Sequence, residues 1–242
     1  ARARSSRKVL ILFSGPYSRP DGLAAFLTKL GLEPVLIDND PVEGGGEDGD
    51  LLNDKIYRKL FRRVSDGEFC CVFAAPPCST FSISRFYQKG QDGPPVVRDR
   101  THILGLDNVS DTHKRELRNA NAIVARTCKL LHAGWRVGTQ FCVENPVDRG
   151  DRAHPFAYLH AEHGPIWLMP EMIDLNRDCD CESANFSQCN FGSDWQKQTT
   201  FMFTAGLSSW FSSLNDLRCT HSSHGRAAGG EQRADGTWVS KE

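Results

Sequence analysis

The chain has 242 residues, of which 39% are hydrophobic and 24% charged, and its formal net charge at pH 7 is -1. These values predict a globular core of ordinary size and exclude a polycation that binds nucleic acid through bulk charge, but they leave room for a local basic groove. No apolar stretch approaches the roughly 20 residues that cross a bilayer, and ARARSSRKV lacks the apolar centre of a secretory signal. We therefore expect an intracellular protein, nuclear if eukaryotic, with reduced cysteines.

Apolar runs that predict strands alternate with helical segments along the first 146 residues. The strands are expected at 8–14, 33–40, 69–74 and 137–145, and the helices at 23–31, 50–64 and 112–133. Asp111 is expected to cap the last of these helices and Gly134 to end it, and the second helix should carry a basic outer face. This alternation is typical of an open α/β sheet, Rossmann-like, with helices on both faces.

The pattern weakens after Pro146. The segments PIWLM (165–169) and TTFMFT (199–204) are expected to form short strands, and the chain from about His221 is rich in Gly, Ser and charge, which predicts an irregular tail.

Small and acidic residues follow the first two strands, at the edge of the sheet where ligands of such folds bind. Phe13, Ser14 and Gly15 form a turn that enters a helix, and Asp38 lies at the acidic end of the second strand, at a position suited to the hydroxyls of a ribose. The absence of a full G-x-G-x-x-G favours an adenosine ligand other than a dinucleotide. A solvated loop acid explains Asp38 equally well.

A thiol and a carboxylate lie at the ends of the third and fourth strands. Cys78 lies after Pro76 and Pro77, and Glu144 precedes Asn145 and another proline. A thiolate whose pKa is lowered by backbone N–H groups is a strong nucleophile, and a partly desolvated Glu can donate a proton. If the strands are neighbours, the pair can add to an electron-poor ring and protonate it.

In these motifs the chain resembles the cytosine-5 DNA methyltransferases. The resemblance rests on the ordered motifs LFSG, the strand-end Asp38, Asp50 in GDLL, PPCSTFS, VENP and FGSDWQKQTTFMF, between about Val9 and Phe203. It is similar above all to a compact branch of the family found in mobile elements and algal genomes. The resemblance implies a Rossmann-like S-adenosylmethionine-dependent fold that methylates carbon 5 of cytosine.

Residue roles follow from this resemblance, position by position. Cys78 would attack carbon 6 of a flipped-out cytosine, and Glu144 would bond ring nitrogen 3 and the exocyclic amine. The remaining positions would bind S-adenosylmethionine (Phe13, Gly15, Asp38, Asp50 and Pro76) or the nucleic acid (Pro77, Ser79, Thr80, Ser82, Arg85, Asn145, Gln196, Lys197 and Thr199). The expected partner is double-stranded DNA, with RNA also open.

The chain departs from the family pattern in its last third. Gln198 and Thr200 stand where the family has arginines that steady the base, and Lys197 is expected to take their role. We divide the chain into a catalytic core (1–146), a short insertion or minimal target-recognition region (147–190), and the end of the core with an irregular tail (191–242). The small middle region indicates a larger parent polypeptide, low specificity or a targeting partner.

Cysteines and histidines in the last third form a second candidate site. Thiolate and imidazole groups are the usual ligands of tetrahedral zinc. The candidate ligands are Cys179, Cys181, Cys189, Cys219, His221 and His224. A structural zinc and unconnected loop residues both fit this spacing, whereas the methyl-transfer chemistry needs no metal.

Two other classes of protein remain compatible with the sequence. The missing arginines also suit a nucleic-acid-binding or adaptor protein that keeps the fold without turnover. The segment APPC approximates the Pro-Pro-aromatic motif of amino-group methyltransferases, but Cys78 occupies the place of the aromatic residue that would sandwich the base.

Overall fold

The computed structural model describes residues 6–41, 45–86, 94–154, 156–193 and 197–224, together with the backbone of 229–232 and 238–241. Its centre is a six-stranded sheet in the order β2-β1-β3-β4-β6-β5. The strands are β1 (Lys8–Leu12), β2 (Glu33–Ile37), β3 (Cys71–Ala74), β4 (Gln140–Pro146), β5 (Cys181–Ser187) and β6 (Gln198–Thr204). The first four are parallel, and β6 is antiparallel to both β4 and β5. The predicted fold class, an open α/β sheet, is confirmed.

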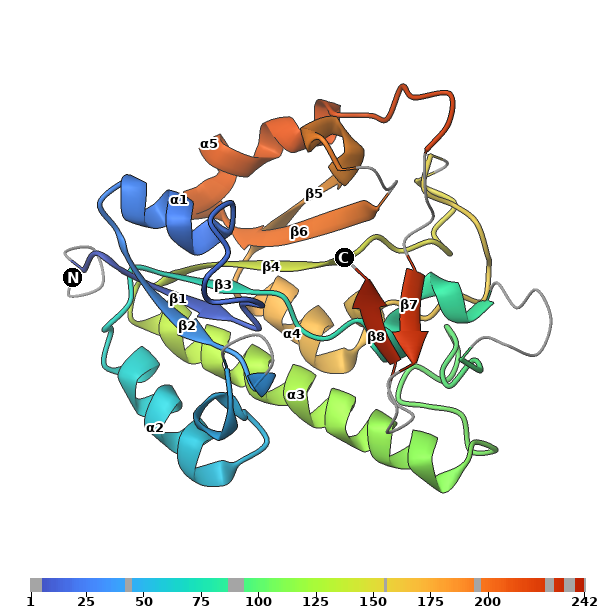
Figure 1. Cartoon of the computed structure of the whole chain (residues 1–242), viewed down its shortest axis with the longest axis horizontal. Helices are drawn as coiled ribbons and strands as arrows, with labels where there is room; N and C mark the ends of the chain where they lie inside the picture. The colour runs from blue at the N-terminus through green and yellow to red at the C-terminus, as the bar shows by residue number, and fades with distance from the viewer. Residues whose placement is uncertain are drawn as a thin grey trace.

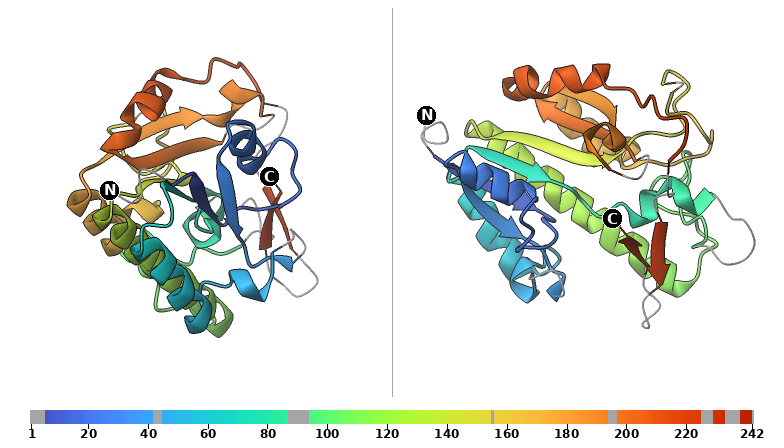
Figure 2. Two further views of the ribbon diagram at one scale, coloured as in Figure 1. Left: turned by 90° about the vertical axis from the view of Figure 1, so that its left-hand side faces the viewer. Right: turned by 45° about the horizontal axis from the view of Figure 1, so that its top comes forward.

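Helices cover both faces of this sheet (Figure 1). They are α1 (Leu23–Lys29), α2 (Asp54–Ser65), α3 (Asp111–Arg136), α4 (Pro170–Asp178) and the short α5 (Ser208–Phe211). In Figures 1 and 2, α2, α3 and α4 lie on one face, while α1 and α5 lie on the other. This division follows from right-handed crossovers, because the chain moves in opposite directions along the sheet through α1 and through α2.

Two apolar clusters fix these layers. The larger joins β1, β3 and β4 to α2, α3 and α4, with Leu10, Val72, Val143 and Leu131 at most 1% exposed. The smaller lies on the opposite face, where Phe203 packs with Cys142, Ala184 and the side chains around α5. Because successive side chains of a strand point to opposite faces, neighbouring residues such as Met202 and Phe203 of β6 belong to different clusters.

The ends of α3 differ from the sequence prediction. Ser110, not Asp111, is the N-cap, and its side chain accepts a hydrogen bond from the His113 N–H. Gly134 lies inside the helix at a close contact, since a Cβ there would be 2.9 Å from Val64 Cγ1. The helix ends two residues later, before Gly138 with its φ of 92°.

Three elements of the last third also differ from expectation. PIWLM is not a strand but carries the 3-10 turn η6 (Ile166–Leu168), because Pro165 and Pro170 flank it and Pro170 begins α4. Strand β5 was not predicted. The tail contains an antiparallel hairpin of β7 (Gly229–Gln232) and β8 (Trp238–Lys241), and β8 lies against the 3-10 turn η4 (Ser79–Phe81). The predicted strand at 199–204 is confirmed as β6.

Among the residues that the structure describes, no helix is both long enough and apolar enough to cross a bilayer.

Candidate active site

The carboxyl ends of the four parallel strands stop at one level of the sheet. Ile37, Leu12, Ala74 and Val143 are register partners across β2, β1, β3 and β4. The chain passes from β1 to β2 on one side, and β3 lies on the other side of β1, so a crevice is expected beyond the ends of β1 and β3. The turns after β1, β2 and β3 begin at this level, and Glu144 follows Val143 in β4.

The turn after β1 is fixed to the start of the loop after β2. Phe13 adopts a φ of 59°, and its N–H donates to the Ile37 carbonyl over 2.7 Å. The Gly15 N–H donates to Asp38 Oδ2 over 2.9 Å, and the Asp40 N–H donates to Asp38 Oδ1 over 2.8 Å. A carboxylate can accept about four hydrogen bonds. Two acceptor positions of Asp38 therefore remain for a ligand.

The loop that leads to Asp50 packs directly on Asp38. A Cβ at Gly49 would lie 1.9 Å from the Asp38 carbonyl oxygen, and one at Gly45 would lie 2.3 Å from it. Only glycine permits this contact, which brings Asp50 to the same side of the crevice. Asp50 Oδ1 accepts a hydrogen bond from the Leu52 N–H over 2.8 Å, which orients its carboxylate before α2.

Cys78 lies at the end of the proline turn after β3. Its backbone, with φ of -93° and ψ of 0°, begins η4, and its carbonyl accepts a hydrogen bond from the Phe81 N–H. The side chain is half-buried. Burial raises the pKa of Cys71, inside β3, to about 12, so that thiol stays protonated at neutral pH. The structure therefore places Cys78, unlike Cys71, at the edge where ligands of this fold class bind.

The turn with Cys78 is attached to the end of β4. The Asn145 side-chain amide donates to the Pro76 carbonyl over 2.8 Å, and Asn145 is buried. Glu144 follows Val143, the register partner of Ala74. The hydrogen bond between Asn145 and Pro76 and the pairing of β3 with β4 thus bring the segments of Cys78 and Glu144 together. The sequence predicted this proximity if the two strands were neighbours.

Lys197, the residue directly before β6, approaches Glu144. Its Nζ lies 3.7 Å from Glu144 Oε1, and both side chains are only 15% exposed. Thr199, opposite Pro146, is fully buried and accepts a hydrogen bond from the Gln188 side-chain amide. Gln196 lies outside the described residues. The predicted substrate contacts of Lys197 and Thr199 stay predictions, but Lys197 is placed at the carboxylate.

The hydroxyl and guanidinium groups after Cys78 have partners within the protein. Arg85 is 3% exposed, and it donates to the Ser79 carbonyl and to Glu116 over 2.7 and 2.6 Å. Ser79 Oγ donates to the same Glu116 carboxylate over 3.4 Å, while Ser82 Oγ bonds Ser84 Oγ. These contacts order the loop around Cys78. The expected phosphate contacts of these residues and of the turn residue Pro77 stay predictions.

A buried arginine that the sequence analysis missed supports the same loop. Arg98 is 1% exposed, donates to Thr80 Oγ1 and Asn121 Oδ1 over 3.0 Å each, and stacks 3.9 Å from the centre of the Phe81 ring. Burial lowers its pKa to about 10, so it remains charged at neutral pH. Thr80, 2% exposed, is thereby held inside. No local signal separates Arg98 from the neighbouring Arg100 in the sequence.

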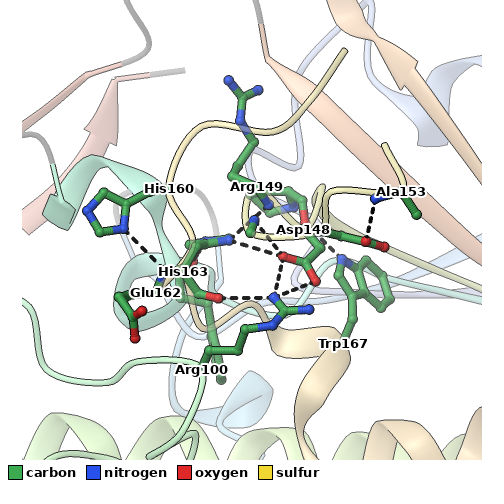
Figure 3. Close-up of polar contacts among 12 residues, drawn as sticks. Arg100, Asp148, Arg149, Ala153, His160, Glu162, His163 and Trp167 are labelled. Carbon is green, nitrogen blue, oxygen red and sulfur yellow. Dashed lines mark hydrogen bonds and ion pairs between the residues drawn. The ribbon is translucent and has the colours of Figure 1, made fainter. Parts of the chain in front are cut away.

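A buried histidine, also missed, links the turn after β3 to the loop after β4. His163 Nδ1 accepts the Arg149 N–H over 3.0 Å, so the ring proton lies on Nε2 and is donated to the Phe81 carbonyl over 2.9 Å. Figure 3 shows the surrounding network, in which Arg100 Nη1 bonds both carboxylate oxygens of Asp148 over 2.9 Å. The segment after Glu144 is therefore tied to the segment after Cys78.

We predict that His163→Leu lowers the free energy of unfolding by about 2–4 kcal/mol, because it leaves the Phe81 carbonyl and the Arg149 N–H buried without their partner. Urea denaturation measures this change. The control is His102→Leu, at a side chain that is 58% exposed and expected to change stability by about 0.5 kcal/mol or less. Equal stabilities of the two variants would contradict the linking role of His163.

A separate cavity of about 230 Å³ lies beside α4, at the outer edge of the sheet. Asp148, Trp167, Asn176, Asn185 and Thr200 are among the residues that line it. Thr200 precedes Phe201, the partner of Glu144 in β6, so Thr200 and Glu144 point to opposite faces. This cavity is therefore distinct from the predicted cofactor crevice.

Four of the six candidate metal ligands converge. Cys189 comes from the turn η7 (Gln188–Phe191) and meets Cys219, His221 and His224 of the tail, with all four ligand atoms within 4.8 Å of one another. Cys179 and Cys181 do not join them. Cys179 is 3% exposed in the main core, and Cys181 packs against that core.

Comparisons with known proteins find distant similarity to solved structures. No protein-family model and no curated protein sequence matches the chain. The solved structure of the S. pombe Dnmt2 methyltransferase is 12% identical with a TM-score of 0.40, and the match covers 81% of this chain and 48% of that one. A triple mutant of Spodoptera frugiperda DNMT2 is 13% identical with a TM-score of 0.38, and that match covers 92% and 54%. The chain thus spans about half the length of each.

Proposed function

We propose that the protein transfers a methyl group from S-adenosylmethionine to carbon 5 of cytosine in DNA, through a covalent bond to Cys78. The observation that carries the proposal is the hydrogen bond from Asn145 to the Pro76 carbonyl, which joins the turn of the thiol to the strand end of Glu144. A nucleophile and a carboxylate on adjacent turns, at the carboxyl edge of an open α/β sheet, suit addition to an electron-poor ring.

The residues beyond β1 and β2 fit an adenosine-containing cofactor. The Asp38 carboxylate keeps two acceptor positions for hydrogen bonds from a ligand. A Cβ added at Gly15 would meet no atom within 4 Å, so there is room for a ligand beside the backbone of this turn. These features match the ribose hydroxyls of S-adenosylmethionine, with Phe13, Asp50 and Pro76 on the neighbouring turns. When bound, this group supplies an electrophilic methyl on its sulfonium.

Cys78 would make the target carbon nucleophilic. Its thiolate forms a bond to carbon 6 of the cytosine, which moves an electron pair of the ring to carbon 5. After methylation, a solvent water or hydroxide removes the proton from carbon 5, the electron pair of that C–H bond forms the double bond between carbons 5 and 6, and the bond between Sγ and carbon 6 breaks. The aromatic ring is restored, and the thiolate returns to its starting state.

Glu144 would promote the addition from the opposite edge of the base. Its carboxyl group bonds ring nitrogen 3 and the exocyclic amine of a cytosine taken out of the stack. Lys197, with Nζ 3.7 Å from Glu144 Oε1, holds that carboxyl group and brings positive charge close to the backbone of the nucleic acid. This placement supports Lys197 as the substitute for the family's arginines.

The test is transfer of a labelled methyl group to double-stranded DNA, single-stranded DNA and structured RNA, each followed by mass spectrometry of the nucleosides. The proposal expects labelled 5-methylcytosine, with the highest rate on DNA. A faster reaction on RNA would show that RNA, and not DNA, is the substrate, and it would leave the proposed covalent chemistry unchanged. Binding of S-adenosylmethionine with no methylated cytosine in any substrate would instead favour a non-catalytic binding protein.

We predict that Asp38→Asn weakens S-adenosylmethionine binding about tenfold, because a neutral amide replaces charge-assisted hydrogen bonds to the ribose. Isothermal titration calorimetry measures the Kd. Asp48→Asn makes the same charge change at an exposed position of the following loop and should leave the Kd unchanged. Equal affinities for the two variants would remove Asp38 from the cofactor site.

A further inference from the structure

The cluster of Cys189, Cys219, His221 and His224 has the ligand types and the spacing of a tetrahedral zinc site. Cys219 Sγ lies 3.5 Å from His221 Nδ1 and 3.2 Å from His224 Nε2. Metal–ligand bonds of about 2.0–2.3 Å in a tetrahedron put ligand atoms roughly 3.3–3.8 Å apart. Small adjustments of the side chains would therefore complete the geometry.

The tail is brought to Cys189 by contacts that do not involve a metal. The Asn185 N–H donates to Asn215 Oδ1 over 2.8 Å, and the Asn215 side chain donates back to the Ser183 carbonyl over 3.2 Å. Arg218 then donates to the Asn185 carbonyl over 3.0 Å and places Cys219 beside η7. The ligands thus arrive from two distant parts of the chain along a defined path on β5.

Burial of apolar side chains does not explain how residues 217–224 of the tail are held in place. None of residues 217–224 is buried, so the hydrophobic core contributes little to this segment. Structural zinc commonly supplies folding free energy where a core is lacking. Two thiolates also neutralise the charge of Zn²⁺, and their protons are released to the solvent on binding.

We propose that Cys189, Cys219, His221 and His224 bind one structural Zn²⁺ that fastens the tail to η7. The site reaches the proposed catalytic centre through Gln188, whose N–H donates to the Lys197 carbonyl over 2.9 Å. Zinc would therefore fix the turn that holds Lys197 beside Glu144. Metal binding stands independently of the proposed function, whereas this effect on Lys197 rests on it.

Elemental analysis of the full chain, purified without added chelator, tests metal binding. We expect one zinc per chain, lost in Cys189→Ser and in Cys219→Ser and kept in Cys181→Ser, a matched thiol outside the cluster. Cobalt added to chelator-treated wild-type protein should give the visible absorption of a tetrahedral thiolate site, which avoids any dependence on the folding of variants.

Three outcomes would overturn the site. The first is folded protein that contains no zinc and gives no tetrahedral cobalt spectrum. The second is metal retained in the variant that combines Cys189→Ser and Cys219→Ser. The third is a disulfide between Cys189 and Cys219, in place of bound metal, in protein prepared with a reductant.

The proposed link between zinc and catalysis is tested separately, by kinetics. Removal of zinc by a chelator should raise the KM for nucleic acid about tenfold and leave the Kd of S-adenosylmethionine unchanged. Added zinc should return the KM to its original value. Zinc bound without this KM effect would refute the link but not the site.

Discussion

Cys78→Ser is expected to lower the rate of methyl transfer about 10⁴-fold, because the substitution removes the nucleophile of a covalent mechanism. A serine hydroxyl stays protonated at neutral pH and is far less nucleophilic than a thiolate, and the proposed mechanism assigns no group to deprotonate it. Single-turnover transfer of labelled methyl to DNA measures the loss. Because Cys78 is assigned to the target base and not to the cofactor, the Kd of S-adenosylmethionine should stay unchanged.

Cys70→Ser provides the matched control for that variant. Cys70 is half-buried directly before β3, and its Sγ donates to the Lys8 carbonyl, a bond that a serine hydroxyl can also make. This variant should transfer methyl groups at the wild-type rate. Activity retained in Cys78→Ser, or lost equally in both variants, would contradict the role of Cys78 as nucleophile.

Glu144→Gln is expected to lower kcat about 10²- to 10³-fold, within the range typical of a general acid–base group. The amide keeps the size of the side chain but cannot exchange a proton with ring nitrogen 3 once the base is bound, and it removes the charge that pairs with Lys197 before the base binds. Steady-state kinetics on DNA, with the Kd of the cofactor measured alongside, separates this effect from a loss of cofactor binding.

Glu162→Gln is the control, because it makes the same charge change at an exposed loop position. We expect wild-type kcat from it. If Glu144→Gln kept the wild-type kcat while Cys78→Ser was inactive, another group would have to promote the addition, and the assigned role of Glu144 would be lost.

The four parallel strands of the sheet were predicted from the sequence because they are covered on both faces and therefore consist of continuous apolar runs. The runs that contain Leu10, Val72 and Val143 are of this kind. Strand β5 lies at the edge, and of its residues Ala184, Phe186 and Ser187 are buried, so CESANFS has no clear apolar run. PIWLM misled the prediction because Ile166 is fully buried in a turn and not in a strand.

Only those residues of the candidate site that their immediate sequence neighbours mark could be predicted. Proline turns and strand ends indicate Cys78, Glu144 and Asp38, since these positions follow apolar runs. The supports of the site are contacts between distant residues, such as His163 with Phe81, and a single sequence carries no signal for them. For the same reason, the burial of Arg85 beside Glu116 was not foreseen.

Trapping with 5-fluorocytosine tests the central claim, covalent addition of Cys78 to cytosine, most directly. Fluorine at carbon 5 replaces the proton that must leave, so the bond between the enzyme and carbon 6 cannot be resolved. Incubation with S-adenosylmethionine and substituted DNA should give a denaturation-resistant adduct, with the modified peptide containing Cys78, in the wild type and in Cys70→Ser but not in Cys78→Ser. Product formation without such an adduct, or an adduct that survives Cys78→Ser, would contradict the account.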